Sequence, residues 1–227
     1  MTPLQRLTNL QCLHMSQRDD FRRVSDIYEP ASEVNAIDFT ALTALLDLNL
    51  RNRSVEQLML PPSTLQSLIL NGCHGMVNNT FTASELGALT RIDLGGADLY
   101  WSEVVPMLPH TLVHLGLGGN FHKDDELITF ICNNLSVLTH LDLRFSGSQI
   151  TYQGVSGLTR LTRLAHLDLS VWESASNAAF AGLRVPTSLR MLDLRTDEPP
   201  EPPVVASSVK HLMTQVPMLH VFWGRLY

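Results

Sequence analysis

The sequence lacks long apolar runs, an excess of positive charge and a dense set of cysteines. No apolar segment approaches the ~18 residues of a membrane-spanning helix, and the first residues contain no apolar signal-peptide core. The 16 Lys and Arg are outnumbered by 22 Asp and Glu, so the net charge is −6. General affinity for nucleic acid comes from basic residues that neutralise phosphate. We therefore expect neither membrane insertion nor a nucleic-acid partner.

One short motif recurs along almost the whole chain. Residues 138–143 read Leu-Thr-His-Leu-Asp-Leu, and nearly the same apolar skeleton, L-x-x-L-x-L, recurs eight more times. Copies begin at Leu10, Leu45, Leu65, Leu89, Leu112, Leu138, Leu164, Leu189 and, in degenerate form, Leu219. Alternate residues of a strand point to the same side. The last two apolar residues of each copy are therefore predicted to face a common core.

Most copies follow one another after 20 to 26 residues, and this period resembles that of leucine-rich repeat proteins. The resemblance implies an α/β fold, a right-handed solenoid with a parallel sheet on its concave side and helices and loops on its convex side. Stacked repeats bury an apolar face that one strand cannot bury alone. We expect a single leucine-rich repeat domain over residues 1–227.

The three cysteines are dispersed and odd in number. Secreted leucine-rich repeat proteins usually carry cysteine-bridged caps, so the resemblance favours a reducing, intracellular location, with the cytoplasm as the first expectation. Arginines among the first 23 residues leave organelle targeting as an alternative, although Asp19 and Asp20 interrupt them.

Several segments between the motif copies are expected to be helical or irregular. Residues at about 19–41 exceed the length of one repeat and are predicted as an insertion, with a helix preferred over a degenerate strand for Ser32–Leu42. Convex helices are predicted around residues 101–108, after Asp124, and after Ser207-Ser208. The prolines at residues 198–203 are predicted to form a rigid loop, with a ligand for a proline-binding module as the alternative.

The concave side is predicted to expose three columns of residues, at alternate positions along each copy. The first column is Cys12, Asp47, Ser67, Arg91, His114, His140, His166, Met191 and Val221. The second is His14, Asn49, Ile69, Asp93, Gly116, Asp142, Asp168, Asp193 and Trp223. The third is Ser16, Arg51, Asn71, Gly95, Gly118, Arg144, Ser170, Arg195 and Arg225.

Histidines of three consecutive copies are expected to stack beside a row of aspartates. The candidate partner-binding residues are His114, His140, His166, Asp93, Asp142, Asp168, Asp193, Arg91, Arg144, Arg195 and Trp223. A solvated polar ladder and a protein-recognition surface are both open interpretations, and protonation of the histidines near pH 6 to 7 is expected to make binding pH-sensitive. Replacing Asp142 and Asp168 with Ala is expected to weaken binding and leave folding intact.

The glycines at residues 95–96 and 116–119 do not form a phosphate loop, because no Lys-Ser/Thr follows them. They are expected to leave a flat patch without side chains. The types found at His166, Asp168 and Ser170 occur in catalytic triads, but alternate residues of one strand lie about 6.6 Å apart. We expect no catalytic site, no cofactor and no bound metal.

These features predict a non-catalytic protein-interaction module, or a scaffold or assembly subunit, whose partner is another protein. The segment Ser148–Leu158 is also similar to the cysteine-containing repeats of F-box leucine-rich repeat proteins. That resemblance implies an alternative function, substrate recognition in a ubiquitin ligase. Most copies, however, lack the cysteine or asparagine that follows the strand in that subclass.

Overall fold

The computed structural model of the chain describes residues 6–16, 36–61, 64–75, 82–97, 101–119, 123–146, 149–172, 183–196 and 202–224. Within these residues, nine short strands form one sheet in the order β1-β3-β5-β6-β7-β8-β9-β10-β11. They are β1 Cys12–His14, β3 Asp47–Asn49, β5 Ser67–Ile69, β6 Arg91–Asp93, β7 His114–Gly116, β8 His140–Asp142, β9 His166–Asp168, β10 Met191–Asp193 and β11 His220–Phe222. Each neighbouring pair is parallel, as the repeats predict.

The register of the sheet aligns the middle residues of the strands. Leu115 pairs with Leu141, and Leu141 pairs with Leu167. These leucines are almost fully buried, and so is the first leucine of each copy from Leu45 to Leu189. Each buried leucine stabilises the fold by ~1.5–3 kcal/mol relative to an exposed one. The predicted stack of leucines is therefore confirmed as the core.

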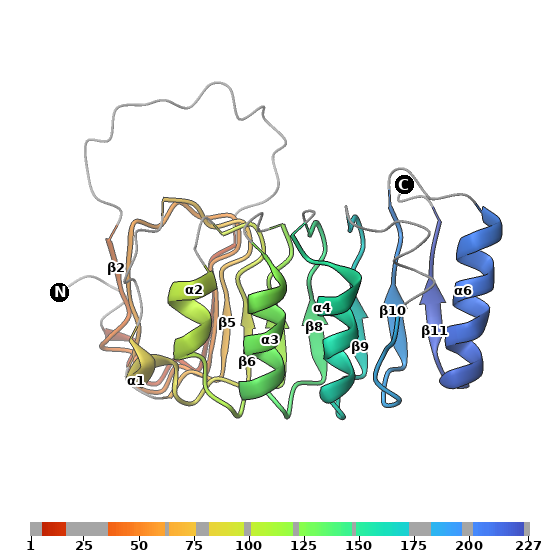
Figure 1. Ribbon diagram of the computed structural model, residues 1–227. Helices are drawn as coiled ribbons and strands as arrows, with labels where there is room; N and C mark the ends of the chain where they lie inside the picture. The colour runs from red at the N-terminus through yellow and green to blue at the C-terminus, as the bar shows by residue number, and fades with distance from the viewer. Residues whose placement is uncertain are drawn as a thin grey trace, which may run out of the picture.

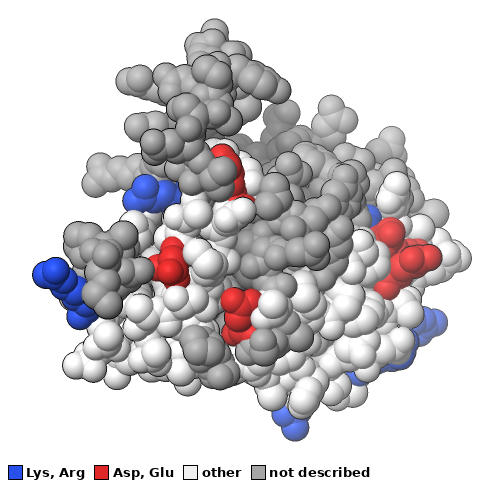
Figure 2. Space-filling view, turned by 90° about the vertical axis from the view of Figure 1, so that its left-hand side faces the viewer, with Lys and Arg blue, Asp and Glu red and all other residues white. Residues whose placement is uncertain are grey.

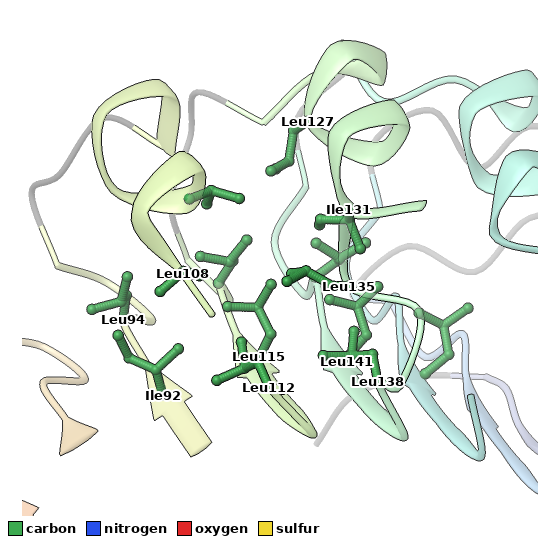
Figure 3. Close-up of a cluster of buried hydrophobic side chains, with 14 of the residues drawn as sticks. Ile92, Leu94, Leu108, Leu112, Leu115, Leu127, Ile131, Leu135, Leu138 and Leu141 are labelled. Atoms are coloured by element: carbon green, nitrogen blue, oxygen red, sulfur yellow. The ribbon is translucent and has the colours of Figure 1, made fainter. Parts of the chain in front are cut away.

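Helices cover one face of the sheet, and in Figure 1 they lie in front of the strands. They are α1 Ala83–Leu86, α2 Trp101–Val104, α3 Asp125–Asn134, α4 Tyr152–Gly157 and α6 Pro202–Gln215, with 3₁₀ turns at Val105–Met107 and Leu158–Arg160. Figure 3 shows Leu127 and Ile131 of α3 above the strand leucines Leu115 and Leu141, and all four are buried. The helices predicted from residue 101 and after Asp124 are confirmed.

Hydrogen bonds at the helix starts tie neighbouring repeats together. Asp124 caps α3 by accepting the backbone N–H of Leu127 at 2.9 Å. Asp125, in the first turn of α3, accepts the backbone N–H of Thr151 at 2.8 Å and its hydroxyl at 2.7 Å. Thr151 is itself the N-cap of α4. The acidic start of one convex helix thus positions the next helix.

The preferred helix at Ser32–Leu42 is wrong for its described part. Ala36–Asp38 form β2, which pairs in parallel with β4, Gln57–Met59, in a separate two-stranded sheet. Phe39 follows the strand, donates its N–H to Met59 O at 2.9 Å and is fully buried. The pairing with β4, which carries the apolar skeleton in the degenerate form Val55-x-x-Leu58-x-Leu60, decides between the helical and the extended interpretation of the segment. Residues 17–35, which hold the rest of the predicted insertion, lie outside the described residues.

Helix α6 begins earlier than predicted. It starts at Pro202, so the rigid loop predicted at residues 198–203 does not include its last two prolines, and Ser207-Ser208 lie inside the helix instead of capping it. Proline is compatible with the first turn of a helix, where the backbone N–H has no acceptor within the helix. Residues 197–201 lie outside the described residues.

Among the residues that the structure describes, no helix combines the length and apolar character required to cross a bilayer. Cys12, Cys73 and Cys132 are all free thiols. Figure 2 views the stack from the end at which β2 lies, where the charged side chains of the described residues lie apart from one another among uncharged ones.

Candidate functional site

The face of the nine-stranded sheet opposite the helices, predicted above as the concave side, is called the open face below. Strands β7, β8 and β9 each begin with a histidine on this face, and the register places His114 beside His140 and His140 beside His166. The ring centroids lie 5.1 Å apart in the first pair and 4.1 Å apart in the second, with angles of 25° and 12° between the planes. The predicted lateral stack of three histidines is therefore confirmed.

Burial keeps part of this stack uncharged. Loss of water, followed by the nearby Arg91 and His140, lowers the pKa of His114 from 6.5 to about 4. Burial also lowers the pKa of His140, with His166 and Arg91 adding to the effect. For His114 and His140 these directions correct the expectation of protonation near pH 6 to 7, because a charged ring in the stack would lose hydration and face like charges.

The stacked rings are poorly arranged to share a metal ion. Imidazole lone pairs lie in the plane of the ring, and the nearly parallel planes of His140 and His166 direct them side by side. A zinc site needs ligand atoms that converge to about 2.0–2.1 Å from one point.

The second column carries the aspartates, and each has a structural role as well as a charge. One carboxylate oxygen of every aspartate in the column accepts the backbone N–H two residues later, at 2.9–3.0 Å. The aspartates are Asp93, Asp142, Asp168 and Asp193, and the donors are Gly95, Arg144, Ser170 and Arg195. Asn49 accepts the N–H of Arg51 in the same way. Ala at Asp142 or Asp168 would leave this N–H without its acceptor, so we expect the substitution to lower the stability of the fold as well as to remove a charge.

Two aspartates of the column are also ion-paired. Arg144 Nη2 lies 2.8 Å from Asp142 Oδ2, and the guanidinium of Arg195 contacts both oxygens of Asp193. Burial raises the pKa of Asp142, and Arg144 opposes that effect. Within the described residues, the carboxylates of Asp93 and Asp168 have no ion pair. The carboxylates of these two aspartates are therefore available to a cationic group of a partner.

The glycines do not leave the flat, empty patch that the sequence predicts. A Cβ at Gly116 would lie 2.6 Å from Asp93 Oδ1, and one at Gly118 would lie 2.7 Å from Arg144 Cγ. Side chains of neighbouring repeats thus occupy the space above the glycine backbone. The absent Cβ atoms allow Asp93 and Arg144 to lie along the sheet.

The last repeat differs from its predicted register by one residue. Met191 pairs with His220, and Asp193 pairs with Phe222, so Phe222 belongs to the second column, in the place predicted for Trp223. Trp223, which is 45% exposed, falls beside the buried Leu194 in this register. The degenerate copy contains one residue fewer between Leu219 and its strand than the other copies, and the motif alone does not reveal this deletion. Arg225 lies outside the described residues.

The open face therefore combines a polar centre with an apolar end. The histidines, the aspartates, Arg91 and Arg144 line a depression of about 290 Å³ that reaches Met191 on β10. Met191 and Phe222 are exposed, and the guanidinium of Arg195 lies 5.9 Å from the centre of the Phe222 ring. Sequence reasoning missed Phe222 as a candidate binding residue because it assigned the last strand to the wrong register.

No protein-family model matches the chain, and no curated protein matches it. Three solved structures show limited similarity to the chain. A leucine-rich repeat protein of Leptospira interrogans is 15% identical, with a TM-score of 0.43 over 96% of this chain and 62% of that one. InlP of Listeria monocytogenes is 16% identical, with a TM-score of 0.44 over 84% and 51%. The mouse RP105/MD-1 complex is 17% identical, with a TM-score of 0.43 over 86% and 42%.

The chain thus spans about three-fifths or less of the length of each of these structures. We assign the fold from features of the chain itself. The L-x-x-L-x-L copies supply the strands, the strands form one parallel sheet in chain order, and the leucines form one continuous core. The chain therefore folds as a leucine-rich repeat solenoid.

Proposed function

We propose that this chain is a non-catalytic interaction module that binds another protein across its open face. The observation that carries the proposal is the 290 Å³ depression, which joins the histidine stack, the aspartate column and exposed Met191 on one continuous surface. A protein partner can combine charged and apolar contacts across such a surface. Apolar anchors supply affinity, and paired charges fix the register of the complex.

The chemistry of the face specifies what the partner presents. The carboxylates of Asp93 and Asp168 are suited to Lys or Arg side chains of the partner, because they have no ion pair within the described residues. Their neighbours Asp142 and Asp193 are already paired with Arg144 and Arg195. The stacked histidine rings provide flat surfaces and hydrogen-bonding nitrogens between these aspartates. Met191 and Phe222 are suited to an apolar side chain at the C-terminal end of the face.

The geometry around the residues of triad type supports a binding role over a catalytic one. Asp168 Oδ1 accepts the backbone N–H of Ser170 at 2.9 Å, and His166 Nδ1 is buried with no hydrogen-bond partner among the described residues. In a triad the acid orients the histidine, and the histidine contacts the nucleophile. Neither contact is present among these three described residues.

Site-specific photo-cross-linking tests the proposal. A photoreactive amino acid at Met191 on the open face is expected to capture a protein partner in cells, whereas the same amino acid at exposed Thr129 on α3 is expected not to capture it. Capture of the same partner with equal yield from both positions would contradict binding across the open face. Capture from Thr129 alone would place the interface on the helical side.

The captured protein also tests the alternative function. Recovery of an adaptor subunit of a ubiquitin ligase, cross-linked at a position away from the open face, would favour substrate recognition in such a ligase. The three free cysteines support the additional proposal that the protein works in a reducing compartment.

A further inference from the structure

A second group of side chains lies on the open face at its N-terminal end, away from the histidine stack. Cys12 and His14 occupy alternate positions of β1, so both project from the same face of the sheet. Asp47, on the neighbouring strand β3, is the direct partner of Cys12 in the parallel register. The fold therefore brings a thiol, an imidazole and a carboxylate from two adjacent strands to one place.

The functional atoms of these three residues converge. His14 Nε2 lies 3.3 Å from Cys12 Sγ and 2.9 Å from Asp47 Oδ1, and all three atoms lie within 4.8 Å of one another. Zinc binds sulfur at about 2.3 Å and nitrogen or oxygen at about 2.0–2.2 Å, so ligand atoms around a tetrahedral ion lie about 3.3–3.6 Å apart. Small movements of exposed side chains would bring the three atoms to these separations.

Hydrogen bonding alone does not account for this convergence. A single imidazole nitrogen carries either one proton or one lone pair, so Nε2 of His14 can make one good hydrogen bond, to Cys12 or to Asp47, at a time. A cation between the three residues would use the lone pair of the nitrogen, the thiolate and the carboxylate together. His14 and Asp47 are accessible, with 54% and 38% of their side-chain surfaces exposed, so an ion can reach them from solvent.

We propose that Cys12, His14 and Asp47 form a binding site for Zn²⁺, with the fourth coordination position open to water. The mixed set of sulfur, nitrogen and oxygen ligands selects the class of metal, because Ca²⁺ and Mg²⁺ prefer sites built from oxygen alone. Binding displaces the proton of the Cys12 thiol, so the affinity falls as the pH is lowered. The site lies on the open face but is independent of partner binding at the histidine stack.

Calorimetric titration of the purified chain with Zn²⁺, in a non-coordinating reductant, tests the stoichiometry and the affinity. One strongly bound ion per chain is expected, and Cys12→Ser and His14→Ala are each expected to weaken its binding by ~100-fold or more, since loss of even an outer contact costs 10- to 100-fold. The matched control is His220→Ala, which removes an exposed histidine from the first position of β11, at the opposite end of the same face, and it is expected to leave the affinity unchanged.

Substitution with Co²⁺ identifies the ligands directly. The native chain is expected to show a thiolate-to-cobalt charge-transfer band together with the visible bands of four-coordinate cobalt, and Cys12→Ser is expected to abolish the charge-transfer band. Circular dichroism of each variant verifies that the fold is retained. Absence of stoichiometric binding, a cobalt spectrum without a thiolate band, or Zn²⁺ binding by Cys12→Ser as tight as that of the native chain would overturn the proposal.

Discussion

The imidazole rings of His140 and His166 stack with their centroids 4.1 Å apart and their planes 12° from parallel. This contact joins two adjacent repeats on the surface that we propose as the binding site. With His114 it forms a stack of three rings, and burial lowers the pKa of His114 and of His140. The stack therefore makes the stability of the fold depend on pH.

Acid is expected to destabilise the protein through His114. Its pKa is about 4 in the folded chain, against an ordinary value of 6.5, so between these values the unfolded chain binds more protons. The free energy of unfolding then falls as the pH is lowered from 6.5 towards 4, with a slope of up to ~1.4 kcal/mol per pH unit for one proton. Denaturation at several pH values should show a shallower slope in His114→Gln. Equal slopes for the variant and the native chain would show that His114 does not contribute.

Two substitutions at Asp168 distinguish the contribution of its charge from that of its hydrogen bond to the backbone. Asp168→Asn keeps an oxygen that can accept the N–H of Ser170, as Asn49 does for Arg51 in its own repeat, so its stability is expected to stay close to that of the native chain. Asp168→Ala removes the acceptor and should lower the free energy of unfolding by ~1 kcal/mol. Urea denaturation of the two variants makes the comparison. If Asn destabilises the fold as much as Ala, the charge, and not the hydrogen bond, is the structural contribution of Asp168.

The repeat motif predicts the main sheet because burial of every motif leucine requires the same strand direction and register. It predicts the histidine stack for the same reason, since His114, His140 and His166 hold equivalent positions in three equal copies. The motif cannot specify the contacts of side chains across repeats, such as Asp93 above Gly116. Those contacts depend on the rotamers that the packed neighbours allow.

Two predictions from the sequence are wrong for the same physical reason: the helix at Ser32–Leu42 and the register of the last strand. β2 pairs with β4, and each strand carries the motif only in degenerate form, with valine in place of the first leucine at Val34 and Val55. At the other end, the deletion after Leu219 moves Phe222 onto the open face. A shift of one residue reverses the side to which every side chain of a strand points. In both cases the pairing with a neighbouring strand, and not the local apolar spacing, decides the conformation or the register.

The backbone conformation at residue 119 is expected to require glycine. The φ of Gly119, 77°, lies in the left-handed region, and an added Cβ would lie 3.3 Å from Gly96 N. Gly119→Ala should lower the free energy of unfolding by at least ~1–2 kcal/mol. The matched control is Gly157→Ala at the end of α4, where an added Cβ meets nothing within 4 Å. That variant should be neutral or stabilising by up to ~1 kcal/mol, and an equal loss of stability in both variants would contradict the conformational argument.

Lys123 is expected to make stability increase with pH in the alkaline range. Its side chain is buried, and Nζ donates to Leu117 O at 2.9 Å and to Arg144 O at 3.2 Å. Burial lowers its pKa from 10.5 to about 8, so between these values the unfolded chain binds the additional proton and the free energy of unfolding rises with pH.

Denaturation between pH 8 and 10.5 measures this contribution as the difference between the native chain and Lys123→Met. The rise should be smaller in Lys123→Met and unchanged in Lys210→Met, which alters an exposed lysine of α6. An unchanged rise in Lys123→Met would mean that another group causes it.

The central claim is that a protein binds the open face. Its most direct test is the affinity of the partner identified by cross-linking for two matched charge variants of this chain. Asp93→Asn with Asp168→Asn removes the unpaired charges of the open face and keeps the backbone hydrogen bonds, whereas Glu126→Gln makes the same chemical change on exposed α3. We predict a loss of affinity of ~10-fold or more for the first variant, which corresponds to ~1.4 kcal/mol, and no change for the second. Unchanged affinity in the first variant, or an equal loss in both, would contradict the claim.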